Sequence, residues 1–300
     1  MTSRKETPQT DLKIGFAGLG VMGEPICRNI LQKSGAAMQV FDLSPAPVAR
    51  LAELGATPAP NIAAMVAEVD ILFLSLPGGK QVDSVVRGEI LPAAPAGLLV
   101  VDTSTSPVGL TRELSEELAA KGVRFADAPV ARTRQAAEDG TLSIMVGGSS
   151  EDFATLRPLL AHAATDITHC GPVGCGQVVK ILNNMVLFET VVALSEALTL
   201  GRAAGVDADL LFDTLSKGSA DSFALRNHGM KAMLPDTFPE GAFPTNYALK
   251  DVSYALDLAT LTGFKAHGAE LARSRMEKAR DAGLDNAYFP ALIRVMDRAQ

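Results

Sequence analysis

The chain has 300 residues, of which 47% are apolar and 20% charged, and its formal net charge is −7 at pH 7. This length and composition predict two domains with enough apolar side chains for a large core. The acidic balance argues against a protein that binds nucleic acid regardless of sequence, because such proteins need a basic face.

Residues 1–12 are polar and lack the apolar centre of a signal peptide, so we expect a flexible tail there. No run of about 18 apolar residues occurs in the sequence, which predicts no membrane-spanning segment. The three cysteines have no paired spacing and the four histidines are scattered, so neither a disulfide framework nor a metal site is predicted. We therefore expect a reduced, cytoplasmic protein.

From residue 13 onward, short apolar runs alternate with helical patterns. The runs are continuously apolar, as is typical of parallel strands that are buried on both faces. Predicted strands cover residues 13–17, 38–42, 70–76, 98–102, 123–128, 141–147 and 166–169. Helices are expected near residues 22–34, 46–54, 61–67 and 79–87. This alternation predicts an α/β domain with a doubly wound parallel sheet over residues 13–171.

The alternation stops at the turn sequence G-P-V-G, residues 171–174. The next stretch has no proline or interior glycine over about 28 residues, and as one helix it would be about 40 Å long. Apolar residues cover most of its circumference, so we expect this helix to be buried. Everything beyond it has a helical pattern. The sequence therefore predicts an all-α domain over residues 172–300, joined to the first domain through the long helix.

Gly18, Gly20 and Gly23 have the spacing G-x-G-x-x-G and lie between a predicted strand and a predicted helix. In this context the first glycine permits a tight turn, the second lets the backbone approach a pyrophosphate, and the third lets the helix pack on the strand. The positive end of the helix then favours the phosphate charge. Glycines that serve only the turn are the alternative interpretation.

Asp42 ends the second predicted strand, 19 residues after Gly23. A carboxylate at this place accepts hydrogen bonds from a ribose diol and repels a 2′-phosphate, which favours NAD over NADP. Alternatively, Asp42 only begins the turn D-L-S-P. Arg50 lies on the following helix and is expected to be a solvated surface charge.

The sequence T-S-T-S-P, residues 103–107, follows the carboxyl end of another predicted strand. Open α/β sheets bind ligands at that end. The hydroxyls of Ser104 and Thr105 are therefore candidates for hydrogen bonds to a nicotinamide ribose or a substrate. Ser106 before Pro107 also has the pattern of a helix N-cap with proline at the first helical position.

Lys180 lies one turn into the long helix, and Asn184 follows four residues later on the same face. Apolar neighbours leave this lysine poorly solvated unless it lines a cleft. Desolvation lowers the pKa of an ammonium group, which makes a lysine usable as a general acid and base near neutral pH. The alternative is a lysine that extends to solvent from the first turn. Lys250 lies beside Asp251 in the helical half of the sequence. From the residues alone, a charge on a solvated helix face is as good an interpretation of Lys250 as a functional role.

Four motifs in this order resemble the β-hydroxyacid dehydrogenase family: the glycine motif, D-T-S-T-S-P, D-A-P-V…G-T-L and G-x-x-x-K-x-x-N-N. The resemblance covers roughly residues 13–295, and the family includes 3-hydroxyisobutyrate dehydrogenase and tartronate semialdehyde reductase. It implies a Rossmann domain joined by a long helix to an all-α domain, with the active site between them. It also implies hydride transfer between a nicotinamide and the β-carbon of a small hydroxy acid, a homodimer or homotetramer, and no metal.

The same resemblance assigns roles to single residues. It implies that Lys180 is the catalytic lysine, that Asn184 orients the substrate, and that Thr105 lies near both nicotinamide and substrate. Lys250 would close over the cofactor, and Phe243 would line the cleft. The complete cofactor-binding set is Gly18, Leu19, Gly20, Val21, Met22, Gly23, Asp42, Leu76, Pro77, Thr105, Gly176 and Lys250, with Gly176 letting the long helix begin against the cofactor.

The chain departs from the family pattern at residues 127–133. Most relatives read D-x-P-V-S-G-G there, whereas this chain reads D-A-P-V-A-R-T, which is similar to the G-R-T variant of sulfolactaldehyde reductase. A guanidinium offers paired donors to a carboxylate and positive charge to a sulfonate. Arg132 and Thr133 are therefore expected to hold the acidic end of the substrate. Alternatively, Arg132 faces solvent or pairs with Glu138.

These observations predict an NAD-dependent oxidoreductase that acts on a short β-hydroxy acid or its semialdehyde, with Lys180 as general acid and base and with NADP as the alternative cofactor. The expected partners are a small anionic substrate and further copies of the chain, not nucleic acid or membrane. One alternative is a sulfolactaldehyde or dihydroxypropanesulfonate oxidoreductase that uses Arg132. Another is a non-catalytic NAD-binding sensor, against which the presence of both Lys180 and Asn184 argues.

Overall fold

The computed structural model describes residues 12–296, so the predicted tail lies outside the described residues except for Leu12. The chain divides into two compact units, Met1–Lys180 and Ile181–Gln300, and the division falls inside the long helix.

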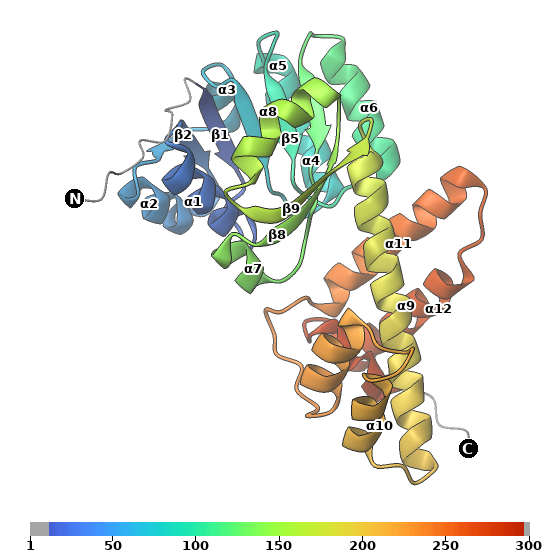
Figure 1. The fold of residues 1–300 in the computed structure, drawn as a ribbon. Helices are drawn as coiled ribbons and strands as arrows, with labels where there is room; N and C mark the ends of the chain where they lie inside the picture. Colours follow the sequence, from blue (N-terminus) through green and yellow to red (C-terminus); the bar gives the residue numbers. More distant parts are fainter. Residues whose placement is uncertain (1–11, 297–300) are drawn as a thin grey trace. The chain divides into compact units, whose positions relative to one another are not determined.

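The first unit is built on one sheet (Figure 1). The strand order is β3-β2-β1-β4-β5-β6-β8-β7, with β9 beside β8. Strands β3 to β6 pair in parallel, whereas β8 is antiparallel to β6 and β7. The strands are β1 (Lys13–Ala17), β2 (Ala37–Phe41), β3 (Thr57–Pro58), β4 (Ile71–Leu74), β5 (Leu99–Asp102), β6 (Arg124–Asp127), β7 (Val130–Ala131), β8 (Leu142–Gly147) and β9 (Ala164–Gly171).

Alternate residues of the central strands serve two separate hydrophobic cores, one on each face of the sheet. Phe73 of β4 packs in the core that contains Ile26 and Leu156 of two helices. Its neighbour Leu72 packs in the other core, with Val82 and Leu114 of two further helices. Because both faces are covered, these strands are apolar along their length, with carboxylates only at the carboxyl ends of β5 and β6. The predicted doubly wound fold is confirmed, and so is the reason for its continuous apolar runs.

The helices of this unit are α1 (Gly23–Ser34), α2 (Pro45–Glu53), α3 (Ile62–Val66), α4 (Gly79–Val85), α5 (Leu91–Ala93), α6 (Val108–Ala119), α7 (Arg134–Asp139) and α8 (Ser150–Leu160), with a π-helical segment at Val86–Ile90. The four predicted helices correspond to α1 to α4. The two-residue strands β3 and β7 and helices α5, α7 and α8 were not among the predicted elements, whereas α6 begins one residue after the helix start that was expected at Pro107.

The long helix α9 (Cys175–Ala203) has 29 residues, close to its predicted extent. The prediction that it is buried all round was wrong along one stripe, because Val186 is 58% and Leu200 69% exposed, whereas Phe188 and Leu198 are fully buried. By length and composition alone α9 would suffice to cross a membrane. Its buried face packs in the core of the second unit, which is typical of the central helix of a globular domain.

The second unit is helical, as predicted. The described residues beyond α9 form α10 (Ala208–Leu215), a π-helical segment η2 (Leu225–Met233), α11 (Thr245–Thr262), α12 (His267–Ala279), a π-helical segment η3 (Arg280–Leu284) and a 3₁₀ segment η4 (Phe289–Val295). Three phenylalanines, Phe188, Phe212 and Phe289, are completely buried in its core. The isolated bridge between Pro244 and Tyr288 ties the start of α11 to the segment before η4.

Candidate active site

The glycine motif forms the turn between β1 and α1; packing requires glycine at positions 18 and 23, whereas Gly20 faces open space. Gly18 has φ +93°, and a Cβ there would lie 2.3 Å from the carbonyl oxygen of Ser75. A Cβ at Gly23 would lie 2.1 Å from the carbonyl oxygen of Gly18, so this position allows α1 to pack on the turn. A Cβ at Gly20 would meet nothing within 4 Å. The open space at Gly20 fits a pyrophosphate that approaches the backbone.

The start of α1 is suited to an anion. Met22 precedes the helix and offers no side-chain cap to its first N–H groups. Val21 is 56% exposed, while Leu19 is anchored in the core at 2% exposure. The loop therefore presents backbone N–H groups and the positive end of a 12-residue helix. The residues present fit a dinucleotide phosphate.

Asp42 connects the end of β2 to the glycine loop. Its Oδ2 accepts a hydrogen bond from the backbone N–H of Leu19 at 2.6 Å, and its Oδ1 accepts one from Ser44 at 2.7 Å. The second contact is the turn that the sequence left as an alternative, and the first brings the carboxylate to the nucleotide loop. Arg50 is at the surface, as expected, where both of its donors bind Glu24 of α1 at 2.6 and 2.7 Å.

The loops after β4 and β5 are bound to each other. Leu76, which precedes Pro77, donates its N–H to Oγ of Ser104 at 2.8 Å. The hydroxyl of Ser106 donates to Oδ2 of Asp102 at 2.9 Å, and α6 begins only at Val108. The expected helix cap at Ser106 was therefore wrong. Its hydroxyl instead stabilises the loop that carries the half-buried Thr105.

A buried carboxylate holds the start of α9. Asp127, at the end of β6, accepts hydrogen bonds from the N–H of Gly174 at 2.6 Å and of Gln177 at 2.7 Å. Burial raises its pKa to about 6, against the lowering effect of these hydrogen bonds and with a further increase from the charge of Asp102. A Cβ at Gly176 would lie 2.7 Å from Oδ2 of Asp127 and 2.4 Å from a carbonyl oxygen of β8. Gly176 is thus required for packing, independently of any cofactor.

Lys180 is half-buried and ends the first unit. It lies in α9 one turn after Gly176, and the neighbouring Val179 is 42% exposed. Asn184 follows four residues later in the same helix. Because residues four apart share one helix face, α9 presents an amine and an amide on one side.

In the second unit, Asn184 and Lys250 share one carboxylate. Asn184 donates from Nδ2 to Oδ2 of Asp251 at 2.8 Å, and Nζ of Lys250 lies 3.2 Å from Oδ1. Asp251 is only 4% exposed. Lys250 also lies 5.2 Å from the ring centroid of Tyr247 and 5.5 Å from that of Tyr254. Lys250 is therefore part of a buried polar group and not of a solvated helix face. Sequence reasoning named Asp251 only as a neighbour and missed its part in this group.

Phe243 packs in the aromatic cluster of the same unit. Its ring centroid lies 5.9 Å from that of Phe188 and 5.5 Å from that of Phe289. The backbone oxygen of Phe243 accepts from the N–H of Phe289 at 3.0 Å. These contacts fix Phe243 just before α11 begins at Thr245. Lys250 follows Phe243 by seven residues, within that helix.

Arg132 adopts a left-handed backbone with φ +89°, which an L-residue rarely does. Its guanidinium donates to the carbonyl of Thr141 at 2.6 Å, to the hydroxyl of Thr165 at 2.8 Å and to Asp166 at 2.6 Å. The side chain is exposed, but its acidic partner is Asp166 and not Glu138, which pairs with Arg28. Thr133 caps α7, because its hydroxyl accepts from the N–H of Ala136 at 3.2 Å.

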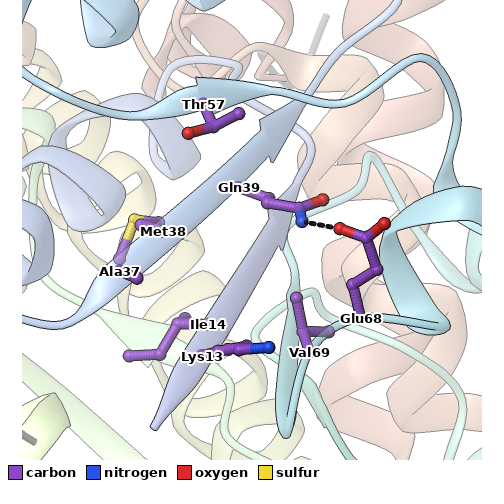
Figure 2. Close-up of a pocket in the computed structure, with 8 residues that line it drawn as sticks. All are labelled: Lys13, Ile14, Ala37, Met38, Gln39, Thr57, Glu68 and Val69. Atoms are coloured by element: carbon purple, nitrogen blue, oxygen red, sulfur yellow. Dashed lines mark hydrogen bonds between the residues drawn. The ribbon is translucent and has the colours of Figure 1, made fainter. Parts of the chain in front are cut away.

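The first unit contains two hollows. One, of about 210 Å³, lies at the amino ends of β1 and β2, where Gln39 donates to Glu68 (Figure 2). The other, a groove of about 430 Å³, is lined by residues 148–150, His169 and 171–173. Ligands of open α/β sheets bind at the carboxyl ends of the strands, so the first hollow is not the candidate site. Among residues 12–296 no three His, Cys, Asp or Glu side chains gather as metal ligands.

A glycine loop that leaves space for a pyrophosphate, a carboxylate bound to that loop, and polar loops after β4 and β5 define a dinucleotide-binding unit of the Rossmann class. This class of unit, followed by a helical unit, occurs in nicotinamide-dependent oxidoreductases.

Comparison with known proteins specifies the family. Residues 13–171 match the model of the NAD-binding domain of 6-phosphogluconate dehydrogenase. Residues 174–296 match the model for the NAD-binding of NADP-dependent 3-hydroxyisobutyrate dehydrogenase. The chain therefore belongs to the β-hydroxyacid dehydrogenase family, as its motifs suggested.

Three relatives illustrate the similarity. The chain is 34% identical to 2-(hydroxymethyl)glutarate dehydrogenase of Eubacterium barkeri, over 97% of this chain and 96% of that protein. It is also 34% identical to 3-hydroxyisobutyrate dehydrogenase of Pseudomonas aeruginosa, over 95% and 99%. A structure of 3-hydroxyisobutyrate dehydrogenase from Mycobacterium tuberculosis with L-serine is 31% identical, with a TM-score of 0.86 over 96% of this chain and 99% of that one.

Proposed function

We propose that this chain is an NAD-dependent dehydrogenase that oxidises a short β-hydroxy acid at its β-carbon, or reduces the matching semialdehyde. The observation that carries the proposal is the pair Lys180 and Asn184 on one face of α9, in a chain of this family. Both closely similar curated relatives act on short acids with a hydroxyl on the β-carbon, as their names state.

In the oxidation direction, Nζ of Lys180 accepts the proton of the substrate hydroxyl, and the amide of Asn184 holds that hydroxyl beside it. A nicotinamide dinucleotide held by the glycine loop would supply the acceptor for the hydride that leaves the β-carbon. Thr105 orients the substrate and the nicotinamide ribose with its hydroxyl, while Phe243 and Lys250 border the reacting groups. Holding the reacting atoms in register supplies most of the rate increase.

Substitution of Lys180 tests this role. Because general acid–base groups contribute about 100- to 10,000-fold, Lys180→Ala should lower kcat by at least about 100-fold with unchanged circular dichroism. Lys180→Arg keeps the positive charge but exchanges no proton near neutral pH, and it should be equally slow. Lys217→Ala removes a lysine that pairs with Asp213 at the surface and serves as the control. Near-normal turnover of folded Lys180→Ala would refute the mechanism.

We propose NAD as the preferred cofactor because the Asp42 carboxylate is bound to the glycine loop and is followed by Leu43, which is 94% exposed and uncharged. A 2′-phosphate would meet a negative charge there and no cation from the next residue. Initial rates with NAD and NADP should favour NAD by at least about tenfold, equivalent to 1.4 kcal/mol. The double variant Asp42→Asn with Leu43→Arg should reduce or reverse this ratio. A wild-type preference for NADP would contradict the assignment.

We propose that Arg132 and Thr133 bind the acidic end of the substrate. The guanidinium is at the surface and already holds one carboxylate, that of Asp166, so a substrate acid would compete with or join that pair. Arg132→Ala should raise KM for the acid, whereas Asp166→Asn should lower it by releasing the guanidinium. Arg134→Ala is the matched control, because Arg134 lies two residues further along the chain and its side chain is 67% exposed. If neither substitution changes KM, Arg132 only stabilises its loop through its contacts with Thr141, Thr165 and Asp166.

A second candidate substrate class carries a sulfonate in place of the carboxylate. The observation that favours it is the exposed guanidinium of Arg132 beside Thr133, at the place where the chain departs from the pattern that the family resemblance implies. NADH formation should be measured with 3-hydroxyisobutyrate, glycerate and dihydroxypropanesulfonate, on the wild type and Arg132→Ala. Turnover of the sulfonate that is lost in the variant would establish this alternative. No turnover with any acid and either cofactor, despite cofactor binding, would favour a non-catalytic NAD-binding protein.

We further propose that the chain acts in the cytoplasm as a homodimer or homotetramer. The exposed stripe of α9, with Val186 and Leu200, is apolar enough to be covered by a second copy. Light scattering should give a mass of two or four chains of 31.4 kDa, and Val186→Lys with Leu200→Lys should shift it toward the monomer. A monomeric wild type at micromolar concentration would contradict the assembly.

A further inference from the structure

The first turn of α9 is bound to two strand ends at once, and both contacts involve Gln177. Its backbone N–H donates to Asp127 at the end of β6, as described above. Its side chain is completely buried. The Nε2 group donates to the carbonyl of Ser104 at 2.8 Å, and Oε1 accepts from the N–H of Ser106 at 3.1 Å. One glutamine therefore binds the residues on both sides of Thr105.

The loop around Thr105 is also bound to Asp102, the last residue of β5. Asp102 accepts from the N–H of Ser104 and from the hydroxyl of Ser106, each at 2.9 Å. Asp102 and Asp127 are register partners on the parallel strands β5 and β6. The two strand ends, the Thr105 loop and the helix start thus form one buried hydrogen-bonded group within the first unit.

Lys180 follows Gln177 by three residues in the same helix, which is about 4.5 Å along the helix axis. A helix has no freedom to slide or rotate once its first turn is fixed by a side chain and by two backbone contacts. The position of the Lys180 backbone relative to Thr105 is therefore determined by Gln177 and Asp127. Glycines at 147 and 176 allow this closeness, because a Cβ at Gly147 would lie 2.4 Å from Asp127 Oδ1.

We propose that Gln177 and Asp127 are positioning residues for the proposed dehydrogenase reaction, and that they fix Lys180 relative to the Thr105 loop. This inference rests on the proposed function of Lys180. Neither residue needs to touch substrate or cofactor. Their effect on the rate passes through Lys180, so it should disappear when the lysine is removed.

A double-mutant cycle tests this coupling. Gln177→Met keeps the side chain's length but loses both amide contacts, and misplacement of a reacting group by about 1 Å costs on the order of 100-fold in rate. With Lys180 present, Gln177→Met should lower kcat by about 100-fold while the dissociation constant for NADH changes less than about threefold. In the Lys180→Ala background, the same substitution should change kcat by less than about threefold.

Two further variants keep the test decisive. If Gln177→Met does not fold, Asp127→Asn replaces it in the same cycle, because it keeps the side chain's shape and one acceptor oxygen for the helix. Thr111→Val is the control for a lost buried hydrogen bond in the same unit, since the Thr111 hydroxyl donates to the carbonyl of Pro107 at the start of its own helix, α6. This control should leave kcat unchanged in both backgrounds.

The outcomes separate the two proposals. An equal loss of kcat in both backgrounds would overturn the positioning role, because a general structural defect does not depend on the lysine. A loss confined to NADH affinity would overturn it as well. If Lys180→Ala alone retains its turnover, the proposed function itself fails, and the inference that rests on it fails too.

Discussion

The two units bury their polar groups in different ways. In the α/β unit, the buried carboxylates Asp102 and Asp127 accept hydrogen bonds mainly from backbone N–H groups at the strand ends and at the start of α9. In the helical unit, Asp251 is held by two side chains, those of Asn184 and Lys250. His228, which is 7% exposed, makes a hydrogen bond through Nδ1 to the hydroxyl of Tyr288.

This difference has a physical consequence. A backbone donor is removed only by substitution with proline, and these donors are in place only when the strands and the helix have formed, so the hydrogen bonds to the carboxylates depend on the fold of the α/β unit as a whole. Side-chain donors can be removed one at a time, and each removal leaves a buried group without its partner. The helical unit should therefore be the more sensitive of the two to single substitutions at its polar group.

The largest effect is expected at Lys250, whose removal leaves the buried Asp251 without its cation. Breaking one side of a buried ion pair costs about 3–5 kcal/mol, so Lys250→Met should lower the free energy of unfolding by about that amount. The side chain of Lys250 is 27% exposed, which places the expected loss near the lower end. Urea unfolding monitored by circular dichroism provides the measurement.

Adding Asp251→Asn to Lys250→Met should recover part of that stability, because the second substitution removes the unpaired charge and keeps an oxygen for Asn184. No recovery in the double variant would mean that Lys250 acts through its packing between the two tyrosine rings and not through the ion pair.

A slightly smaller effect is expected from His228 of the helical unit. Its effect on stability depends on pH, in the direction opposite to that of Asp127 in the α/β unit. Burial lowers the pKa of His228 to about 4, below the ordinary value of 6.5. Between these values the unfolded chain binds a proton that the folded chain does not. The contribution of the neutral His228 to the free energy of unfolding is therefore fully present above pH 6.5, and it falls by about 3 kcal/mol as the pH is lowered to 4.

All three tyrosines lie in the helical unit and the chain has no tryptophan, so tyrosine fluorescence follows the unfolding of that unit. Urea titrations at pH 7 and 4.5 should show the loss in the wild type and a smaller one in His228→Gln. An equal loss in both proteins would remove His228 as its source.

Asp127 should give the α/β unit a pH dependence of the opposite sign. Its folded pKa of about 6 lies above the ordinary 3.8, so the folded chain holds a proton that the unfolded chain has lost in this interval. The stability of the unit should fall by about 3 kcal/mol as the pH rises from 4 to 6. Hydrogen exchange in β6 and in the first turn of α9 measures this, and Asp127→Asn should abolish it. Protection that rises over this interval would contradict the assigned shift.

Much of this fold was predictable because its strongest signals are local. Strands β1, β4 and β5 are buried on both faces and therefore continuously apolar, apart from Lys13 at the start of β1 and Asp102 at the end of β5. The long helix was recognised from its unbroken sequence without glycine or proline. Strands β3 and β7 have two residues each and carry no periodicity of their own. They exist because neighbouring strands offer them hydrogen bonds, which a local pattern does not contain.

The candidate site divides in the same manner. The glycine motif and Asp42 were found because their spacing in the sequence is itself the signal. The hydrogen bonds of Gln177 to Ser104 and Asp127 were missed, since these partners lie 73 and 50 residues earlier in the chain. Nothing in the sequence around Gln177 indicates that its amide faces a distant loop. The partner of Arg132 was missed for the same reason, because Asp166 lies on β9.

The smallest predicted effect concerns a surface position of the α/β unit. A left-handed backbone costs an L-residue about 1–2 kcal/mol relative to glycine, and an exposed ion pair returns about 0–1 kcal/mol. Arg132→Gly should therefore be more stable than Arg132→Ala by about 1 kcal/mol, and close to the wild type. Thermal unfolding of the three proteins tests this order. Equal stability of the two variants would mean that the loop abandons its φ of +89° when the arginine is lost.

The backbone of Arg132 also affects how this protein can change over generations. Because residue 132 already adopts this unfavourable backbone, exchange of its side chain should cost at most about 1 kcal/mol, and glycine there should leave the stability close to that of the wild type. Residue 132, for which we propose contact with the substrate's acid group, can therefore be exchanged while the sheet, the glycine loop and the anchored start of α9 remain unaltered. Libraries restricted to residues 131–133 and 166 would explore substrate selectivity with few unfolded members.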